Sequence, residues 1–351
     1  MRCFRAQHWV SSTGARAPGG AKLRRRALQL VRGLVSANKF RTPANNALAP
    51  TMHPPTDRTL HELKRARVEL EAVAGTALSC ATRAIRRVEV RLARPLRVAI
   101  VGEFNSGKSS LANLLVGIEG LPTAVVSSTR IPTLLYQATE PEIWAIHHDG
   151  KREWLRSDRR SHEQSIIRLE VGLPSPRLRA VQILDLPGLA DPRSDSGGLG
   201  NLALHNVDAV IWCTVCTQAW KESERAVWNQ LPARLRDRAL LVTTHSDLLH
   251  NANDKEKLLS RLRREAGSFR DIVLISTNEA LALFQEEPGA LVEAAWNASG
   301  ARALERALDE LLQSVRKHRL DAAITVTGRI AHRTLTRIEE QPTPHGSKSA
   351  R

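Results

Sequence analysis

The sequence predicts an α/β fold, with a mostly parallel sheet covered by helices on both faces and a short helical bundle formed by the two ends of the chain. Apolar runs typical of buried strands alternate with helical stretches through the middle of the chain. Apolar repeats with helical spacing stand before and after that region. Apolar residues make up 42% of the 351 residues and charged residues 25%, a globular composition that excludes a chain disordered throughout.

Residues 1–56 are predicted to form a basic, disordered tail. They hold ten of the 52 Lys and Arg residues and no Asp or Glu, so the net charge of +16 falls to +6 for the rest. Three explanations stay open: an artefact of the assigned translation start, a tail that touches a membrane, and an organelle transit peptide. The first rests on Met52, the only methionine after Met1, just before the first well-patterned helix. Because the excess charge lies in this tail, a nucleic-acid partner is not expected.

Leucines and alanines recur at helical spacing from residue 57 to about residue 93, which predicts an N-terminal bundle helix within 57–94. The pattern returns at 304–315 and weakens toward residue 340. It predicts C-terminal bundle helices within 299–340, followed by a disordered tail at 341–351. Neither helix could bury its apolar stripe alone, so we expect them to pack against each other.

The region between these helices, residues 95–298, is predicted to be one α/β domain. Asp149-Gly150 is a hairpin turn signal, and the longest apolar runs are too short for a conventional membrane-spanning helix. The expected strands are 96–101, 133–138, 142–148, 152–155, 166–171, 180–184, 207–213, 239–243 and 272–276, and the expected helices are 109–116, 222–231, 255–265 and 281–296.

The four cysteines are too few and too scattered for a disulfide framework, so a reducing compartment is expected. Cys213 and Cys216 form a C-x-x-C without a second ligand pair for a metal. Since they adjoin an apolar run, they are predicted to be buried and structural.

Residues 102–109 have the sequence GEFNSGKS, a G-x-x-x-x-G-K-S motif between a predicted strand and a predicted helix. In this context the backbone N–H groups of the loop wrap phosphates, and the start of the helix adds partial positive charge. Lys108 is expected to reach the β- and γ-phosphates of a nucleotide, and the Ser109 hydroxyl to ligate Mg²⁺. The predicted phosphate-binding residues are Gly102, Asn105, Ser106, Gly107, Lys108, Ser109 and Ser110.

Asp185-Leu186-Pro187-Gly188 directly follows the strand predicted at 180–184. A carboxylate at this strand end would hold a metal-bound water, which makes Asp185 a predicted metal ligand. The N–H of Gly188 could meet the γ-phosphate and sense its loss. A D-x-x-G tetrapeptide is common, but its place after a phosphate-binding loop makes it a strong signal.

Thr244-His245-Ser246-Asp247 follows the strand predicted at 239–243, where GTPases have N/T-K-x-D. The Asp247 carboxylate would accept from N1 and N2 of guanine, a donor pattern that adenine lacks. The imidazole of His245, in place of the usual lysine, could stack on the base. An alternative is that Asp247 only caps the next helix. Ser276 and Thr277, at the end of the last predicted strand, are further candidates for contact with guanine.

Together these residues resemble the dynamin superfamily of large GTPases, particularly the bacterial dynamin-like proteins. The resemblance covers about residues 95–285 and rests on GEFNSGKSS at 102–110, LPTAVVSSTRIPTLL at 121–135, LPSPRLRAVQILDLPGL at 173–189 and THSD at 244–247. The LPSP turn before D-x-P-G is its most diagnostic part. The resemblance implies a P-loop GTPase domain that hydrolyses GTP to GDP with Mg²⁺, homodimerisation through that domain, and contact with an anionic membrane surface.

The resemblance also selects the switch threonine among Thr123, Thr129 and Thr133. The first switch of the family places its threonine before a basic or small residue and a proline, which favours Thr129. The catalytic residues implied are Lys108, Thr129, Asn105 and Gly188, and the metal ligands are Ser109, Thr129 and Asp185. Asn105 could in addition hold a monovalent cation such as K⁺.

The sequence departs from the family pattern at two points. Only 73 residues follow Asn278, too few for the family's helical stalk, and Phe104 stands where eukaryotic members have a glutamine. One alternative is a ribosome- or tRNA-associated GTPase, a group that also has an asparagine at the position of Asn105. The other is a GTP-gated interaction module with little turnover. The expected location is the cytoplasm, with or without attachment to a membrane surface.

Overall fold

The computed structural model of the protein describes residues 55–73, 79–118, 131–155, 165–189, 204, 206–286 and 290–340. These residues fall into two compact units. The larger unit is Pro95–His318, and the smaller unit combines the chain up to Arg94 with the chain from Arg319. The candidate site lies within the larger unit.

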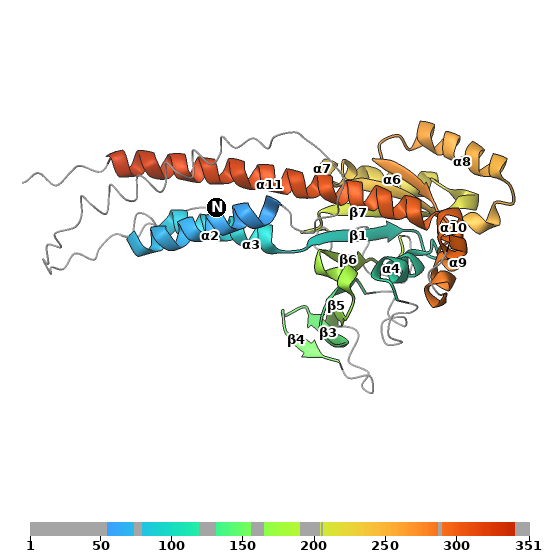
Figure 1. Ribbon diagram of the computed structural model, residues 1–351, viewed down its shortest axis with the longest axis horizontal. Helices are drawn as coiled ribbons and strands as arrows, with labels where there is room; N and C mark the ends of the chain where they lie inside the picture. The colour runs from blue at the N-terminus through green and yellow to red at the C-terminus, as the bar shows by residue number, and fades with distance from the viewer. Residues whose placement is uncertain are drawn as a thin grey trace, which may run out of the picture. The chain divides into compact units, whose positions relative to one another are not determined.

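The described strands of the larger unit form one nine-stranded sheet (Figure 1). They are β1 (Leu96–Gly102), β2 (Thr133–Gln137), β3 (Glu142–His147), β4 (Arg152–Trp154), β5 (Ile166–Leu173), β6 (Val181–Asp185), β7 (Ala209–Val215), β8 (Ala239–Thr244) and β9 (Asp271–Leu274). Their order is β4-β3-β5-β2-β6-β1-β7-β8-β9. The five strands from β6 to β9 are parallel, β2 is parallel to β5 but antiparallel to β6, and β3 is antiparallel to β4 and β5. The predicted α/β fold with a mostly parallel sheet is confirmed.

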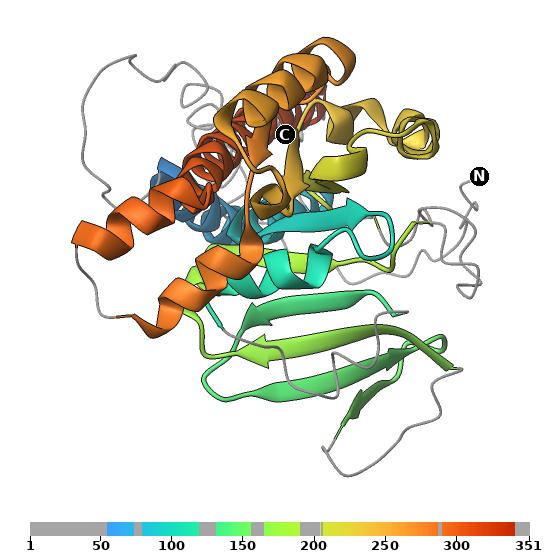
Figure 2. The same cartoon turned by 90° about the vertical axis from the view of Figure 1, so that its right-hand side faces the viewer.

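Helices cover both faces of the sheet around β1, and the edge strands β3 and β4 extend beyond them (Figure 2). On one face, α4 (Lys108–Val116), α9 (Thr277–Ala282), α10 (Ala290–Ala298) and the first part of α11 (Ala301–Glu340) contribute to one hydrophobic cluster. On the other face, α6 (Glu222–Gln230), α7 (Ala233–Arg236) and α8 (Ala252–Glu265) contribute to a second. Val98 and Ile100 of β1 belong to the first cluster, and Ala99 and Val101 to the second. Because side chains alternate along a strand, a strand buried on both faces has the continuous apolar sequence seen here.

The two cysteines predicted to be structural are both buried, which confirms that prediction. Cys213 lies on β7 within the first hydrophobic cluster, and Cys216 lies in the second. Burial raises the pKa of each thiol above its ordinary value, because an apolar environment disfavours the thiolate. Both are therefore poor nucleophiles at neutral pH.

The smaller unit contains α2 (Pro55–Val73), α3 (Ser79–Ala93) and the part of α11 from Arg319 onward. An ion pair with 3.1 Å between Arg67 Nε and Glu89 Oε1 joins α2 to α3. Arg319 Nη1 donates to the backbone oxygen of Arg94 at 2.7 Å, so the C-terminal helix contacts the end of the N-terminal helices. Within the described ranges, every helix is too short or too polar to cross a membrane.

Several predicted helix boundaries differ from the structure. The single helix expected over 57–93 is two helices, α2 and α3, and residues 74–78 between them include Gly75, which has a low helix propensity. The helix expected over 281–296 is divided into α9, the 3₁₀ turn η5 (Leu283–Gln285) and α10. Pro288 and Gly289 precede α10, and proline cannot donate a helical hydrogen bond. The C-terminal bundle helices are one continuous helix, α11. α2 begins inside the predicted N-terminal tail, and residues 1–54 and 341–351 lie outside the described residues.

Candidate nucleotide-binding site

The loop between β1 and α4 is a tight turn that leaves the start of α4 open. β1 ends at Gly102 and α4 begins at Lys108. Asn105 and Gly107 have left-handed backbone conformations, with φ of 60° and 81°. Glycine adopts this conformation without strain and asparagine tolerates it better than most residues. The first N–H groups of α4 have no helical acceptors, so they are available to bind an anion.

The segment that contains Gly188 packs directly on this loop. A Cβ atom on residue 188 would lie 2.8 Å from the Cα of Phe104, so a larger residue would displace backbone. The next residue, Leu189, donates its N–H to the backbone oxygen of Gly102 at 2.9 Å. The loop and the D-x-x-G segment are therefore held together by the backbone itself.

Lys108 lies buried beneath the loop, with 8% of its surface exposed. Its Nζ donates to the backbone oxygen of Glu103 at 2.6 Å. Burial lowers the pKa of Lys108, and the nearby carboxyl groups of Asp185 and Glu103 oppose that effect. The side chain is thus folded back onto its own loop, where a phosphate oxygen could replace the carbonyl as acceptor.

Asp185 lies at the end of β6, in register with Ile100 of the neighbouring β1. Its Oδ2 accepts a hydrogen bond from Ser109 Oγ at 3.1 Å. Burial raises the pKa of Asp185 to about 6, against the opposing effects of Lys108 and Ser109. The other oxygen, Oδ1, is buried and has no hydrogen-bond partner among the described residues. A buried carboxylate oxygen without a partner, beside a serine hydroxyl, fits the oxygen donors that Mg²⁺ prefers.

The THSD segment lies between the phosphate-binding loop and the turn after β9. Thr244 Oγ1 donates to the backbone oxygen of Ser106 at 2.8 Å, and the Ser246 N–H donates to the oxygen of Ile275 at 3.2 Å. His245 has a left-handed φ of 57°. Asp247 is exposed in the 3₁₀ turn η4 (Ser246–Leu248).

The alternative role for Asp247, capping the next helix, is not seen. The next helix is α8, and its N-cap is Asn251, whose side chain accepts from the Asp254 N–H at 2.8 Å. The Asp247 carboxylate is therefore not needed to start α8. On the neighbouring strand end, Ser276 is buried and serves as the N-cap of α9, and Thr277 is buried as the first residue of that helix.

The predicted site residues gather at the carboxyl ends of neighbouring parallel strands, where open α/β sheets bind ligands. β1 leads into residues 102–110, β6 into Asp185 and Gly188, β8 into residues 244–247, and β9 into Ser276 and Thr277. Thr129, the predicted switch threonine and metal ligand, lies outside the described residues, as does Thr123. Thr133, the third candidate, begins β2, and its hydroxyl donates to the oxygen of Ile131 at 3.2 Å.

A polar cluster that no sequence motif indicates lies beside the phosphate-binding loop. Lys221 Nζ lies 2.8 Å from Glu103 Oε2, and Ser223 Oγ donates to Glu103 Oε1 at 2.6 Å. Burial opposes ionisation of Glu103, but the bonds from Lys221 and Ser223 outweigh it and lower the pKa of this carboxyl. A cavity of about 250 Å³ lies between residues 103–106 and the segment after β7, and Lys221 and Glu224 line it as well.

Glu224 is the buried centre of that cluster, with 2% of its surface exposed. Oε1 accepts from Trp212 Nε1 at 3.1 Å, and Oε2 accepts from Thr214 Oγ1 and from the Lys221 N–H, both at 2.9 Å. Burial raises the pKa of Glu224 above its ordinary value, against these hydrogen bonds. The carboxylate joins the start of α6 to β7 and so supports one wall of the cavity.

Replacing Glu224 with alanine should lower the free energy of unfolding by about 3 kcal/mol, because buried donors would lose their acceptor. Urea unfolding at neutral pH measures the loss. Glu222→Ala is the matched control, since its side chain is 86% exposed in the same helical turn, and it should change little. Because the pKa of Glu224 is raised on folding, its contribution to stability should fall as the pH rises through that pKa. Equal stability of the two variants would contradict the buried role.

Part of this chain is similar in sequence to known proteins. The model of the dynamin family matches residues 98–246. Dynamin-like protein 2 of Campylobacter jejuni is 29% identical over 205 residues, which cover 56% of this chain and 33% of that protein. The isoniazid-induced protein IniC of Mycobacterium tuberculosis is 34% identical over 119 residues, 31% of this chain and 24% of IniC. The chain thus matches a third or less of the length of these two relatives.

Solved bacterial dynamins are also similar to this chain. A structure of an oligomerised bacterial dynamin pair covers 88% of this chain and 46% of its own, with 21% identity and a TM-score of 0.48. LeoA, a bacterial dynamin GTPase from ETEC, covers 79% of this chain and 47% of its own, with 17% identity and a TM-score of 0.46. The family match spans the phosphate-binding loop, Asp185 and Gly188. Residues 98–246 of this chain therefore match the dynamin family, and the chain is similar to bacterial dynamin-like proteins.

Proposed function

We propose that this protein binds GTP together with Mg²⁺ and hydrolyses it to GDP and phosphate by in-line attack of water. The observation that supports this most strongly is the 3.1 Å hydrogen bond from Ser109 Oγ to Asp185 Oδ2, beside the Lys108 ammonium that the Glu103 carbonyl holds at 2.6 Å. Lys108 exchanges its bond to the Glu103 carbonyl for oxygens of the β- and γ-phosphates. Ser109, Asp185 and Thr129 hold Mg²⁺, which when bound neutralises charge between those phosphates.

Base recognition is assigned to the loops after β8 and β9. The Asp247 carboxylate accepts from N1 and N2 of guanine, and the imidazole of His245 stacks on the base. Ser276 and Thr277, at the neighbouring strand end, are the further guanine contacts in this proposal. The bonds from Thr244 to Ser106 and from Ser246 to Ile275 hold this side in place relative to the phosphates.

Activation is assigned to homodimerisation through the GTPase domain. A water-orienting glutamine is absent directly after Gly188, where Leu189 is buried and bonded to the loop through its N–H. Phe104, on the outer side of the loop, is 59% exposed and is available to a second copy. Catalytic positioning that is incomplete in one copy predicts a slow monomer and a faster dimer.

Contact with an anionic membrane surface is assigned to α3. Its exposed residues include Arg83, Arg86, Arg87 and Arg91, whereas its one acidic residue, Glu89, is buried and paired with Arg67. Such a face is attracted to anionic lipids.

The deciding experiment measures GTP turnover of the full chain against protein concentration, with and without vesicles of anionic lipid. Turnover per molecule should rise with concentration and rise further on anionic vesicles but not on neutral ones. GTP binding without turnover at any concentration would favour the interaction module over the hydrolase. A rate per molecule that stays constant would contradict activation by dimerisation.

K⁺ should stimulate hydrolysis roughly tenfold more than Na⁺, which corresponds to about 1.4 kcal/mol in the barrier. Asn105 stands three residues before Lys108 in a left-handed turn, and its side-chain oxygen could hold the ion between the α- and γ-phosphates. There the ion would stabilise developing charge. The rate constant kcat is compared in KCl and NaCl at equal ionic strength for wild type, Asn105→Ala and the exposed control Asn253→Ala. Identical wild-type rates in the two salts would leave Asn105 with a structural role only.

A further inference from the structure

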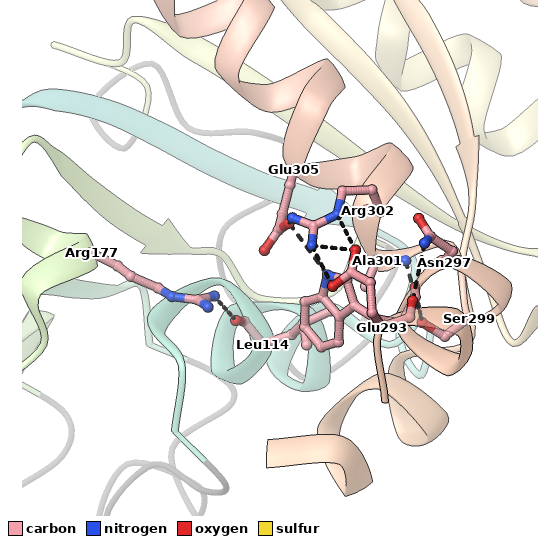
Figure 3. A network of polar contacts seen from close by, with 9 residues as sticks. Leu114, Arg177, Glu293, Asn297, Ser299, Ala301, Arg302 and Glu305 are labelled. Carbon is pink, nitrogen blue, oxygen red and sulfur yellow. Dashed lines mark hydrogen bonds and ion pairs between the residues drawn. The ribbon is translucent and has the colours of Figure 1, made fainter. Parts of the chain in front are cut away.

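The turn before β6 contacts the far end of the phosphate-binding helix α4. Ser175 Oγ donates to the backbone oxygen of Val116 at 2.6 Å, and both residues are buried. Arg177 Nη1 donates to the backbone oxygen of Leu114 at 3.1 Å (Figure 3). The Leu114 oxygen also accepts from the Gly117 N–H at 3.2 Å, and a cation at the end of a helix interacts favourably with the helix dipole. The turn therefore caps α4 from outside.

The cap fits closely around Arg177. Gly117 ends α4 with a left-handed φ of 76°. A Cβ atom on residue 117 would lie 3.2 Å from Arg177 Nε, so the guanidinium is seated directly over the end of the helix. The 3₁₀ turn η2 (Pro176–Arg179) that carries Arg177 leads directly into β6, which ends at Asp185.

Arg177 also contacts the segment that follows α9, the helix after the loop that ends β9. Its guanidinium carbon lies 5.7 Å from the ring centre of Phe284 in η5, the turn that directly follows α9. The Phe284 ring is 5.8 Å from the ring of Trp296, whose Nε1 donates to Glu305 at 3.3 Å.

Phe284, the aromatic partner of Arg177, thus packs beside a network of ion pairs between α10 and α11. Arg302 ties α10 to α11 by donating to Glu293 at 2.7 Å and to Glu305 at 2.6 Å (Figure 3). Phe284 lies between this network and Arg177, which in turn contacts α4. Arg177 therefore contacts both α4, which follows the phosphate-binding loop, and η5, which follows α9.

We propose that Ser175 and Arg177 are positioning residues for nucleotide binding, which hold α4 so that Lys108 and Ser109 stay aligned with Asp185. α4 is nine residues long, so its last turn lies within about 14 Å of its first at 1.5 Å per residue. A clamp on its last turn therefore controls the position of its first. The same turn leads into β6, which ends at Asp185. It therefore contacts the helix that carries Lys108 and Ser109 and also precedes the strand that carries Asp185. The role in nucleotide binding rests on the proposed function, whereas the contacts of Ser175 and Arg177 with α4 do not depend on it.

The test compares Arg177→Ala with Arg179→Ala in the full chain. Arg179 lies in the same turn and makes none of these contacts within the described chain. Arg177→Ala should raise the Kd for Mg²⁺-GTP about tenfold and change kcat at saturation much less. Arg177→Lys, which keeps a donor for Leu114, should restore part of the affinity. Hydrogen exchange without nucleotide should become faster at residues 102–118 in Arg177→Ala only.

Two outcomes would overturn the positioning role. One is a wild-type Kd and wild-type exchange in Arg177→Ala. The other is an equal loss in Arg179→Ala, which would indicate a general effect on stability. Wild-type protein that binds no GTP would refute the proposed function instead, and the exchange measurement would then decide whether the clamp holds α4.

Discussion

Replacing Lys108 with alanine should raise the Kd for GTP at least about 100-fold, because truncating one partner of a buried charged contact costs about 2–5 kcal/mol. Lys108 is the cation that the loop places at the open start of α4, and the loop's own carbonyl holds it there. The fold should survive, since burial already lowers the pKa of this ammonium and removing it relieves a desolvation cost. Equilibrium titration with a fluorescent GTP analogue measures the affinity, and thermal unfolding checks the fold.

Two further variants sharpen this test. Lys108→Met keeps most of the side-chain volume and separates the loss of charge from the creation of a cavity. Lys257→Ala removes an exposed lysine from α8 and should bind GTP like the wild type. Unchanged affinity in folded Lys108→Ala would end the assignment of residues 102–109 as the phosphate-binding loop.

The strands around the site could be predicted because burial on both faces requires an apolar residue at almost every position. β1 and β8 are buried on both faces and show continuous apolar runs. Lys108 follows β1, Asp185 ends β6 and Asp247 follows β8. The predicted strand ends therefore also gave the places of these three residues in the fold. The order of β2, β3 and β5 was not predicted, because the choice between parallel and antiparallel neighbours depends on contacts that leave no local pattern.

The helix errors have a different cause. The sequence at 281–296 keeps its apolar spacing through Pro288 and Gly289, so periodicity alone predicts one helix there. Proline and glycine are the strongest helix-ending signals, and the structure divides this stretch into α9, η5 and α10. At 57–93, Gly75 was a weaker signal of the same kind, because one glycine costs a helix only about 1 kcal/mol.

The supporting residues of the site were not predictable from one sequence. Glu103 and Lys221 are far apart in the chain and form an ion pair only because β7 lies beside β1. Glu224 and Arg177 have the appearance of ordinary surface charges in the sequence, yet one is buried and the other caps α4. A charge acquires such a role through tertiary contact, which spacing along the chain does not record.

Replacing Asp247 with asparagine should reverse the base preference of the protein from GTP toward XTP. The carboxylate accepts from two guanine donors, whereas an asparagine amide presents donors of its own and suits the O2 acceptor of xanthine. The loop should keep its geometry, because Thr244 and Ser246 anchor it through backbone acceptors on both sides. Affinity for GTP should fall about 100-fold or more, since a site built to hydrogen-bond one base strongly rejects another.

Competition of GTP, XTP and ATP for a labelled nucleotide measures this change. Wild type should prefer GTP to both competitors, and Asp247→Asn should prefer XTP. Asp237→Asn removes an exposed charge at the end of α7 and should leave the order unchanged. ATP should gain much less than XTP from Asp247→Asn, because adenine has an acceptor at N1 but no polar group at position 2, so it can pair with only one end of the amide. If Asp247→Asn bound GTP as tightly as wild type, Asp247 would not read the base, and the exposed carboxylate of η4 would have no part in nucleotide selection.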